Sequence, residues 1–180
     1  LLKESLNELK LQPSHNLAII DAVAVELSER ELFFLKKKLN IETTINHSVS
    51  LAGNGWRKGQ RRWQPESVVN DYIEASSAHS RYNFGDDITI GFLDTGLDQL
   101  SGLSTDLYGR DKAWGTYDAI SNSVHNYDDE ANGHGTHVAS IAANSDYDIN
   151  GRIYGVAPNS AIVGIKAFDS EGKATYADVI

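Results

Sequence analysis

Two side chains in this sequence have the chemical types and the sequence contexts needed to activate a nucleophile, namely His134 and Asp94. His134 follows a glycine and precedes a run of small and aliphatic residues, which is typical of a loop that leads directly into a buried helix. The positive end of a helix dipole disfavours an imidazolium, so we expect His134 to act as a neutral base. A carboxylate such as Asp94 can hold the tautomer of that base and stabilise the imidazolium formed when it takes a proton.

The element that would carry Asp94 is a strand over residues 87–94. Apolar residues occupy both alternating sets of positions, which is typical of a strand buried in a parallel sheet. Asp94 falls at the carboxyl end of this strand, where open α/β sheets bind their ligands. A simpler interpretation stays open, in which Asp94 is a solvated turn residue and His134 and His137 only cap and pack a helix.

The phrases around these two residues resemble the motifs of a known enzyme family. Asp-Thr-Gly at 94–96 and Gly-His-Gly-Thr-His-Val-Ala at 133–139 are similar to the aspartate and histidine motifs of the subtilisin-like serine proteases, and their order also matches. Gly-Val-Ala-Pro at 155–158, followed by a strand over 161–168, resembles the next segment of that family. The chain is therefore identified as a subtilase fragment that covers part of the propeptide and the N-terminal part of the catalytic domain.

The resemblance implies an α/β fold with an open, mainly parallel sheet and helices on both faces, incomplete in this chain. We expect residues 70–180 to be the N-terminal part of this peptidase domain. Residues 98–131 are rich in glycine, serine and aspartate, which indicates surface loops with one short strand near 114–117.

The resemblance also implies the chemistry, which is peptide-bond hydrolysis by an Asp-His-Ser triad through an acyl-enzyme. Asp94 and His134 would be catalytic residues, and this chemistry requires no cofactor. The nucleophilic serine and the oxyanion-hole asparagine are expected beyond Ile180. The fragment alone is therefore expected to be inactive.

A further part of the resemblance concerns substrate binding. Gly172, Lys173, Ala174 and Tyr176 match the family segment that pairs with an extended substrate. An extended peptide that adds to a strand edge gains main-chain hydrogen bonds regardless of its side chains. The glycine would permit close approach of the substrate backbone, and the tyrosine would either line a remote subsite or pack on the sheet.

Residues 1–52 form a small α+β module by their sequence pattern. Leucines at helical spacing predict a helix near residues 2–9, and Ser28 with the glutamate three residues later predicts a capping-box start to a second helix. Alternating residues predict strands over 17–27 and 41–49.

This module resembles, in position and pattern, the propeptide of subtilases, which assists folding and inhibits the protease until it is cleaved. By that resemblance, its last segment would lie in the active-site cleft like a substrate. A module of this size would be marginally stable alone and would need a partner. An unrelated α+β domain fused upstream is the alternative.

Residues 53–69 form a linker by composition and are the expected processing region. They contain three glycines, two tryptophans and four basic residues. The pair Arg61-Arg62 would suit a dibasic-specific processing enzyme, whereas self-cleavage is the usual route in the family. A basic loop that docks on the acidic catalytic domain is an equal alternative.

Charge and composition exclude several function classes. Residues 1–65 carry ten Lys and Arg against seven Asp and Glu, whereas residues 66–180 carry six against eighteen. The acidic part repels nucleic acid and anionic membranes, so we expect neither as a partner, and we expect polypeptide substrates and the protein's own propeptide. There is no cysteine and no run of about 18 apolar residues that could span a membrane. From the family we expect a secreted, extracellular monomer whose signal peptide is not in this fragment.

A structural calcium ion is compatible with the sequence, but its ligands stay unassigned. Asp106 matches a calcium ligand of some relatives, and it would need help from Asp146 and Asp148, because calcium takes six to eight oxygens. Residues 128–130 form a separate acidic run. We favour the alternative that all of these are solvated loop carboxylates.

Two other functions stay open. One is a non-catalytic subtilase homologue that acts as a protein-binding scaffold. The other is a metal-dependent hydrolase that uses His134, His137 and an aspartate. Against it, Gly135 suits a tight helix start more than a metal site.

Overall fold

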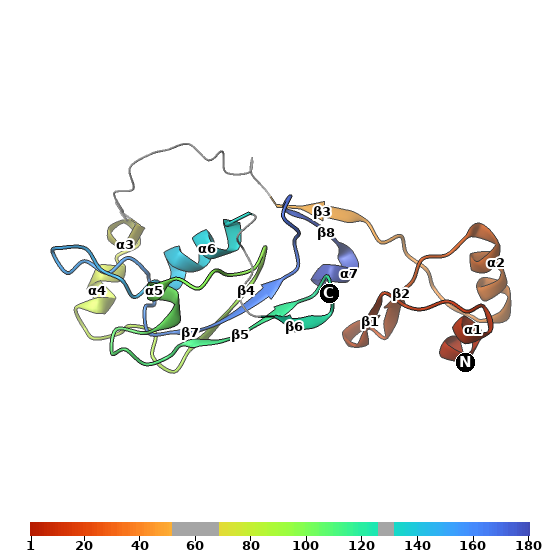
Figure 1. Cartoon of the computed structure of the whole chain (residues 1–180), viewed down its shortest axis with the longest axis horizontal. Helices are drawn as coiled ribbons and strands as arrows, with labels where there is room; N and C mark the ends of the chain where they lie inside the picture. Colours follow the sequence, from red (N-terminus) through yellow and green to blue (C-terminus); the bar gives the residue numbers. More distant parts are fainter. Residues whose placement is uncertain (52–68, 126–131) are drawn as a thin grey trace. The chain divides into compact units, whose positions relative to one another are not determined.

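The chain folds into two compact units in a computed structural model (Figure 1). The described residues are 1–51, 69–125 and 132–180. The first unit consists of Leu1–Val49 with Thr175–Ile180, and the second of Ser50–Ala174. Almost all of the predicted linker, and the whole acidic run at 128–130, lie outside the described residues. No helix within the described ranges is long and apolar enough to cross a membrane.

The first unit combines short helices with a β-hairpin. Its elements are α1 (Leu2–Glu8), β1 (His15–Leu17), the 3-10 helix η1 (Ala18–Ile20), β2 (Ala22–Ala24), α2 (Glu29–Lys38) and α7 (Tyr176–Val179). The hairpin is antiparallel and places Asn16 opposite Val23. Leu6 of α1 and Leu35 of α2 are fully buried, so each predicted helix contributes one leucine to the interior.

The prediction of a single strand over residues 17–27 is wrong. The chain leaves β1 at Leu17, passes through η1 and turns at Asp21, whose φ of 51° is left-handed. Aspartate tolerates this conformation because its short polar side chain can hydrogen-bond locally. The strand predicted over 41–49 forms only at its end, as β3 (Ser48–Ser50).

The predicted start of α2 is confirmed. The backbone N–H of Ser28 donates to Glu31 Oε2 at 2.8 Å, and the N–H of Glu31 donates back to Ser28 Oγ. Hydrogen bonds from the hydroxyl and the backbone of Ser28 lower the pKa of Glu31. The helix begins where two backbone N–H groups find side-chain acceptors.

The second unit is built on a four-stranded sheet. The strand order is β4 (Thr89–Asp94), β7 (Ala161–Lys166), β5 (Ala113–Asp118) and β6 (Ser123–His125). The first three strands are parallel, and β6 is an antiparallel edge strand. The helices of this unit are α3 (Val69–Tyr72), α4 (Ala75–His79), α5 (Ser101–Ser104) and α6 (His134–Ala143). The chain therefore has the mixed α/β fold and mainly parallel sheet that its sequence predicts, and β8 (Lys173–Thr175) pairs separately with β3.

One face of this sheet packs against α5 and α6 (Figure 1). The core formed there consists of Phe92, Leu97, Leu103, Ala139, Ala143 and Ile162. Gly164 makes room for this core, because a Cβ at its position would lie 2.8 Å from Leu97. On the opposite face Leu93 is 42% exposed, so β4 is buried mainly on the face that carries Asp94.

Lys112 is a buried cation that immediately precedes β5. The residue is 2% exposed, and its Nζ donates to the carbonyl oxygens of Ala143 and Pro158. Burial lowers the pKa of Lys112 from the usual 10.5 to about 8, against the opposing effect of Asp106 and Asp146. Because Ala143 is the last residue of α6, the cation lies at the negative end of that helix.

Burial of Lys112 makes the stability of the fold depend on pH. Between about pH 8 and 10.5 the unfolded chain keeps a proton on Lys112 that the folded chain has lost, so the free energy of unfolding rises with pH. We expect the unfolding free energy of the wild type to rise relative to that of Lys112→Met between about pH 7.5 and about pH 10. Urea unfolding at a series of pH values measures the free energies of the wild type and Lys112→Met, and the exposed Lys3→Met is the control. A difference between wild type and Lys112→Met that is constant with pH would contradict this expectation.

Candidate active site

Asp94 ends β4 with its carboxylate buried and oriented. The residue is only 8% exposed, and its Oδ1 accepts from the backbone N–H of Thr95 at 2.7 Å. Its carbonyl oxygen accepts from the backbone N–H groups of Ala167 and Phe168, at 2.9 Å and 3.1 Å. These hydrogen bonds fix both the backbone and the carboxylate of Asp94.

His134 is the first residue of α6, and it faces that carboxylate. Its Nδ1 lies 2.7 Å from Oδ1 and 2.9 Å from Oδ2 of Asp94. Because Nδ1 faces an acceptor, it carries the proton, and the lone pair of the neutral ring is on Nε2. Within the described residues the ring hydrogen-bonds only to Asp94. The arrangement is that of a general base whose tautomer is held by a carboxylate.

Thr95 and Gly135 hold α6 against the end of β4. The backbone N–H of Gly135 donates to Thr95 Oγ1 at 3.0 Å, and Thr95 is itself buried. One residue further along the helix, Thr136 Oγ1 accepts from the backbone N–H of Asp98 at 2.8 Å. The start of the helix is thus fixed by two side-chain hydrogen bonds to the turn that follows β4.

Gly135 lies in close contact with this turn. A Cβ at this position would lie 2.2 Å from the carbonyl oxygen of Gly96, a backbone atom that cannot move alone. We expect Gly135→Ala to lower the free energy of unfolding by roughly 1–3 kcal/mol, as overpacking of a tight contact does, and to move His134 away from Asp94.

Gly91→Ala is the matched control, because it adds the same methyl group to β4 where no atom lies within 4 Å. Its effect on the unfolding free energy should stay within about 0.5 kcal/mol. Urea unfolding of both variants checks the pair of expectations, and equal effects would contradict them.

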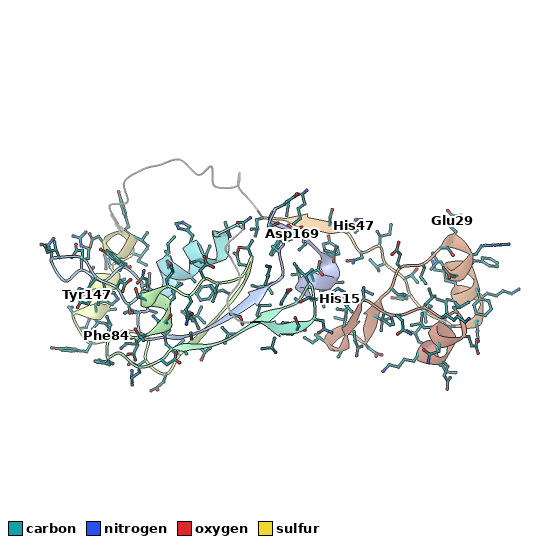
Figure 2. The ribbon with its side chains drawn as sticks, viewed as in Figure 1. His15, Glu29, His47, Phe84, Tyr147 and Asp169 are labelled. Atoms are coloured by element: carbon teal, nitrogen blue, oxygen red, sulfur yellow. The ribbon has the colours of Figure 1, made fainter. Side chains whose placement is uncertain are left out.

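The segment predicted to bind substrate surrounds β8. Asp169, labelled in Figure 2, opens a tight turn in which its Oδ1 accepts from the backbone N–H groups of Glu171 and Lys173. Gly172 has a φ of 74°, which favours glycine, and its carbonyl oxygen accepts from the N–H of Leu51 at 2.9 Å. A backbone from another part of the chain therefore already pairs with the predicted edge.

The other predicted substrate-binding residues have separate surroundings. Ala174 is buried, and the Lys173 ammonium is paired with Glu171, which raises the pKa of the lysine. Tyr176 belongs to the first unit, where its ring lies edge-on to that of His47, with 5.6 Å between the centroids. The structure brings Asp94 and His134 together and groups Gly172 with Lys173 and Ala174 in the second unit.

Two residues at this site were not predicted from the sequence. Thr95 lies within the aspartate motif, and only the fold shows its hydroxyl bridging to α6. Asn132 hydrogen-bonds both to His134 and to Ser170. Its position two residues before the histidine was the available signal.

In the described part of the chain, no group of three or more His, Asp or Glu side chains is placed to hold a metal ion. Asp106 instead accepts hydrogen bonds from Arg110 and from the backbone N–H of Tyr108. Burial acts to raise the pKa of Asp106, but these hydrogen bonds and the charge of Arg110 lower it overall. The described residues therefore do not group His137 with His134 and an aspartate as the ligand set of a metal hydrolase.

Comparison with known proteins gives one family. The sequence model of the subtilase family matches residues 85–180. The serine protease AprX of Bacillus subtilis is 35% identical over 139 residues, which cover 74% of this chain and 30% of AprX. A thermostable alkaline protease of Halalkalibacterium halodurans is 28% identical over 172 residues, covering 92% of this chain and 40% of that protein.

The chain spans less than half of the length of these relatives. Among solved structures, the CspB protease of Clostridium perfringens aligns with 55% of this chain and 25% of its own, at 31% identity and a TM-score of 0.44.

Proposed function

This chain belongs to the subtilase family, and on that premise we propose that the complete protein is a serine endopeptidase with an Asp-His-Ser triad. The observation that carries this proposal is the 2.7 Å contact between His134 Nδ1 and Asp94 Oδ1. It joins the carboxyl end of a parallel strand to the start of a helix, and it leaves Nε2 as the base.

In the proposed mechanism His134 Nε2 takes the proton of a serine hydroxyl as the serine oxygen attacks the scissile carbonyl. The imidazolium then gives this proton to the leaving amine, and water releases the acyl group by the same steps. Asp94 keeps the ring in position and stabilises its cationic form. The chemistry needs no cofactor.

We place the nucleophile and the oxyanion-hole asparagine in the part of the protein that follows Ile180. Two serines of the described residues support this placement, because they are engaged elsewhere. Ser145 Oγ donates to the carbonyl oxygen of Thr105 at 2.6 Å, and Ser160 Oγ donates to that of Gly85 at 2.9 Å. Both residues are buried, so neither hydroxyl can meet a peptide substrate.

Peptide hydrolysis by the complete protein tests this function. We expect cleavage of a denatured protein substrate that a serine-directed phosphonate abolishes and a metal chelator does not. Hydrolysis that stops with the chelator would favour a metal-dependent hydrolase. A folded protein without hydrolysis would favour a binding scaffold.

The proposed substrate is an extended polypeptide, and the proposed subsite is the edge formed by Gly172, Lys173 and Ala174. The hydrogen bond from the Leu51 N–H to the Gly172 carbonyl supports this, because a substrate strand would make the same kind of bond. Leu51 Cδ1 also lies 3.4 Å from the position that a Cβ on Gly172 would take, which illustrates the close approach that a glycine permits.

We propose that residues 1–52 are the inhibitory and folding-assisting propeptide, that 53–69 contain the processing site, and that the peptidase domain begins at residue 70. Contacts of α7 within the first unit support an association of the proposed propeptide with a segment of the proposed peptidase domain. The N–H of Tyr176 donates to the His47 carbonyl, and the N–H of Ala177 donates to Asn46 Oδ1, both at 3.0 Å. The segment before the family domain therefore supplies acceptors to the start of a helix that belongs to that domain.

A third contact links the same two segments. His15, labelled in Figure 2, places its Nε2 3.2 Å from Asp178 Oδ1, and both side chains are largely buried. A carboxylate in the first turn of α7 thus meets a side chain of β1.

We expect residues 1–52, expressed separately, to inhibit the mature protease at micromolar concentration. Leu51→Pro removes the N–H that donates to Gly172 and should weaken inhibition about fivefold, the effect of one hydrogen bond. Leu51→Ala keeps this N–H and is the control. Inhibition constants measured with a peptide substrate check the series, and no inhibition by the unaltered segment would contradict the propeptide assignment.

We further propose that the protein is secreted and acts as a monomer outside the cell. N-terminal sequencing of the mature enzyme from the culture medium tests this and locates the processing site, which we expect between Ala52 and Tyr72. A bound calcium ion would contribute only to stability, and a melting temperature unchanged by chelator would exclude it.

A further inference from the structure

We propose that Asn132 is a positioning residue that couples the substrate-binding edge to His134. Its side-chain Oδ1 accepts from the backbone N–H of His134 at 3.2 Å, and its Nδ2 donates to the carbonyl oxygen of Ser170 at 3.1 Å. The same Nδ2 lies 3.7 Å from the position that a Cβ on Gly172 would take. One planar amide therefore joins the start of α6 to the turn that precedes β8.

The turn that Asn132 contacts is internally fixed. The N–H of Asp169 donates to the carbonyl of Lys173 at 2.8 Å, and the N–H of Gly172 donates back to Asp169 at 2.9 Å. Two further backbone N–H groups are held by the Asp169 carboxylate. Because these hydrogen bonds hold the turn rigid, a peptide that pairs with Gly172 would shift the whole turn. Asn132 would pass this shift to the backbone of His134.

The chemistry of the side chain explains why an asparagine serves here. The position needs an acceptor toward a backbone N–H and a donor toward a carbonyl, on one rigid group, and an amide provides both. An aspartate keeps the acceptor but places a second oxygen against the Ser170 carbonyl. An alanine removes both contacts.

The role of Asn132 rests on the proposed function, and it makes a prediction about substrate length. An amide substrate with four residues on the acyl side is the long probe of the proposed edge at Gly172, and one with a single residue there is the short probe. If Asn132 couples the edge to the base, the wild type should show a higher kcat with the long substrate than with the short one. The ratio of the two kcat values measures the coupling.

The test uses the complete protein and measures kcat and KM for both amide substrates. Each lost hydrogen bond should lower a rate about fivefold. Asn132→Asp keeps the acceptor toward His134 and loses the donor toward Ser170, so it should lower the ratio of kcat for the long substrate to kcat for the short one about fivefold. Asn132→Ala should lower kcat for both substrates and reduce their ratio by the same factor of about five.

Asn150→Ala, in an exposed turn, is the control and should leave the ratio unchanged. Equal losses with both substrates in Asn132→Ala, or a ratio unchanged in Asn132→Asp, would overturn the proposal. Titration of active sites with a serine-directed phosphonate separates this failure from failure of the proposed function. If the wild type itself is not labelled, the endopeptidase assignment fails, whereas a labelled enzyme with an unchanged ratio refutes only the role of Asn132.

Discussion

Replacement of His134 by alanine is expected to lower kcat about a millionfold with little change in KM, the size of effect that loss of the triad histidine has in subtilisin. The reason is that Nε2 is the ring nitrogen left to take the proposed serine proton, since Nδ1 is occupied by Asp94. The proposed substrate-binding edge at β8 does not include the ring, so we expect KM to change little.

His137→Ala is the matched control for this substitution, because it removes a second imidazole from the same helix, one turn further on. Steady-state kinetics on purified, folded protein check the pair, with circular dichroism to verify folding. A His134→Ala enzyme that keeps more than about a hundredth of the wild-type kcat would not fit a role as general base.

Replacement of Asp94 by asparagine is expected to lower kcat roughly ten-thousandfold while the fold is kept. The hydrogen bonds explain why. Asp94 Oδ1 accepts from the Thr95 N–H and also contacts His134 Nδ1, and Oδ2 contacts the same Nδ1 at 2.9 Å. An asparagine whose amide oxygen stays at the Thr95 N–H would place its NH₂ at the Oδ2 position, against Nδ1. An NH₂ donor forces the proton from Nδ1 to Nε2, which can then no longer accept a proton from the serine.

Asp87→Asn provides the control, because this exposed aspartate precedes the same strand and has a left-handed φ of 63° that asparagine also tolerates. It should keep the wild-type kcat. Equal activity of Asp94→Asn and Asp87→Asn would remove Asp94 from the mechanism.

The pairing of Asp94 with His134 follows from local features of the sequence. An apolar strand that ends in a carboxylate and a glycine-histidine phrase that opens an apolar helix each show their element type without tertiary information. Because strands of a parallel sheet point their carboxyl ends to one edge, the strand end and the helix start were expected to meet there. β4, β7 and α6 accordingly lie where the sequence places them.

Features that depend on distant partners could not be predicted in the same way. The hairpin of the first unit turns at Asp21, a residue with no glycine beside it to signal a reversal. A short strand was predicted near 114–117, but the place of β5 in the sheet depends on pairing with β7 and β6, which lie elsewhere in the sequence. Asn132 is a polar residue before a helix by sequence, and its second partner, Ser170, lies 38 positions away.

Labelling of the complete protein with a serine-directed phosphonate, followed by identification of the modified residue by mass spectrometry, tests the assignment most directly. We expect one modified serine in the part of the protein that follows Ile180, and no labelling in His134→Ala. Absence of labelling in folded, processed wild-type protein would contradict the assignment and would make the Asp94 and His134 pair a feature of a binding scaffold.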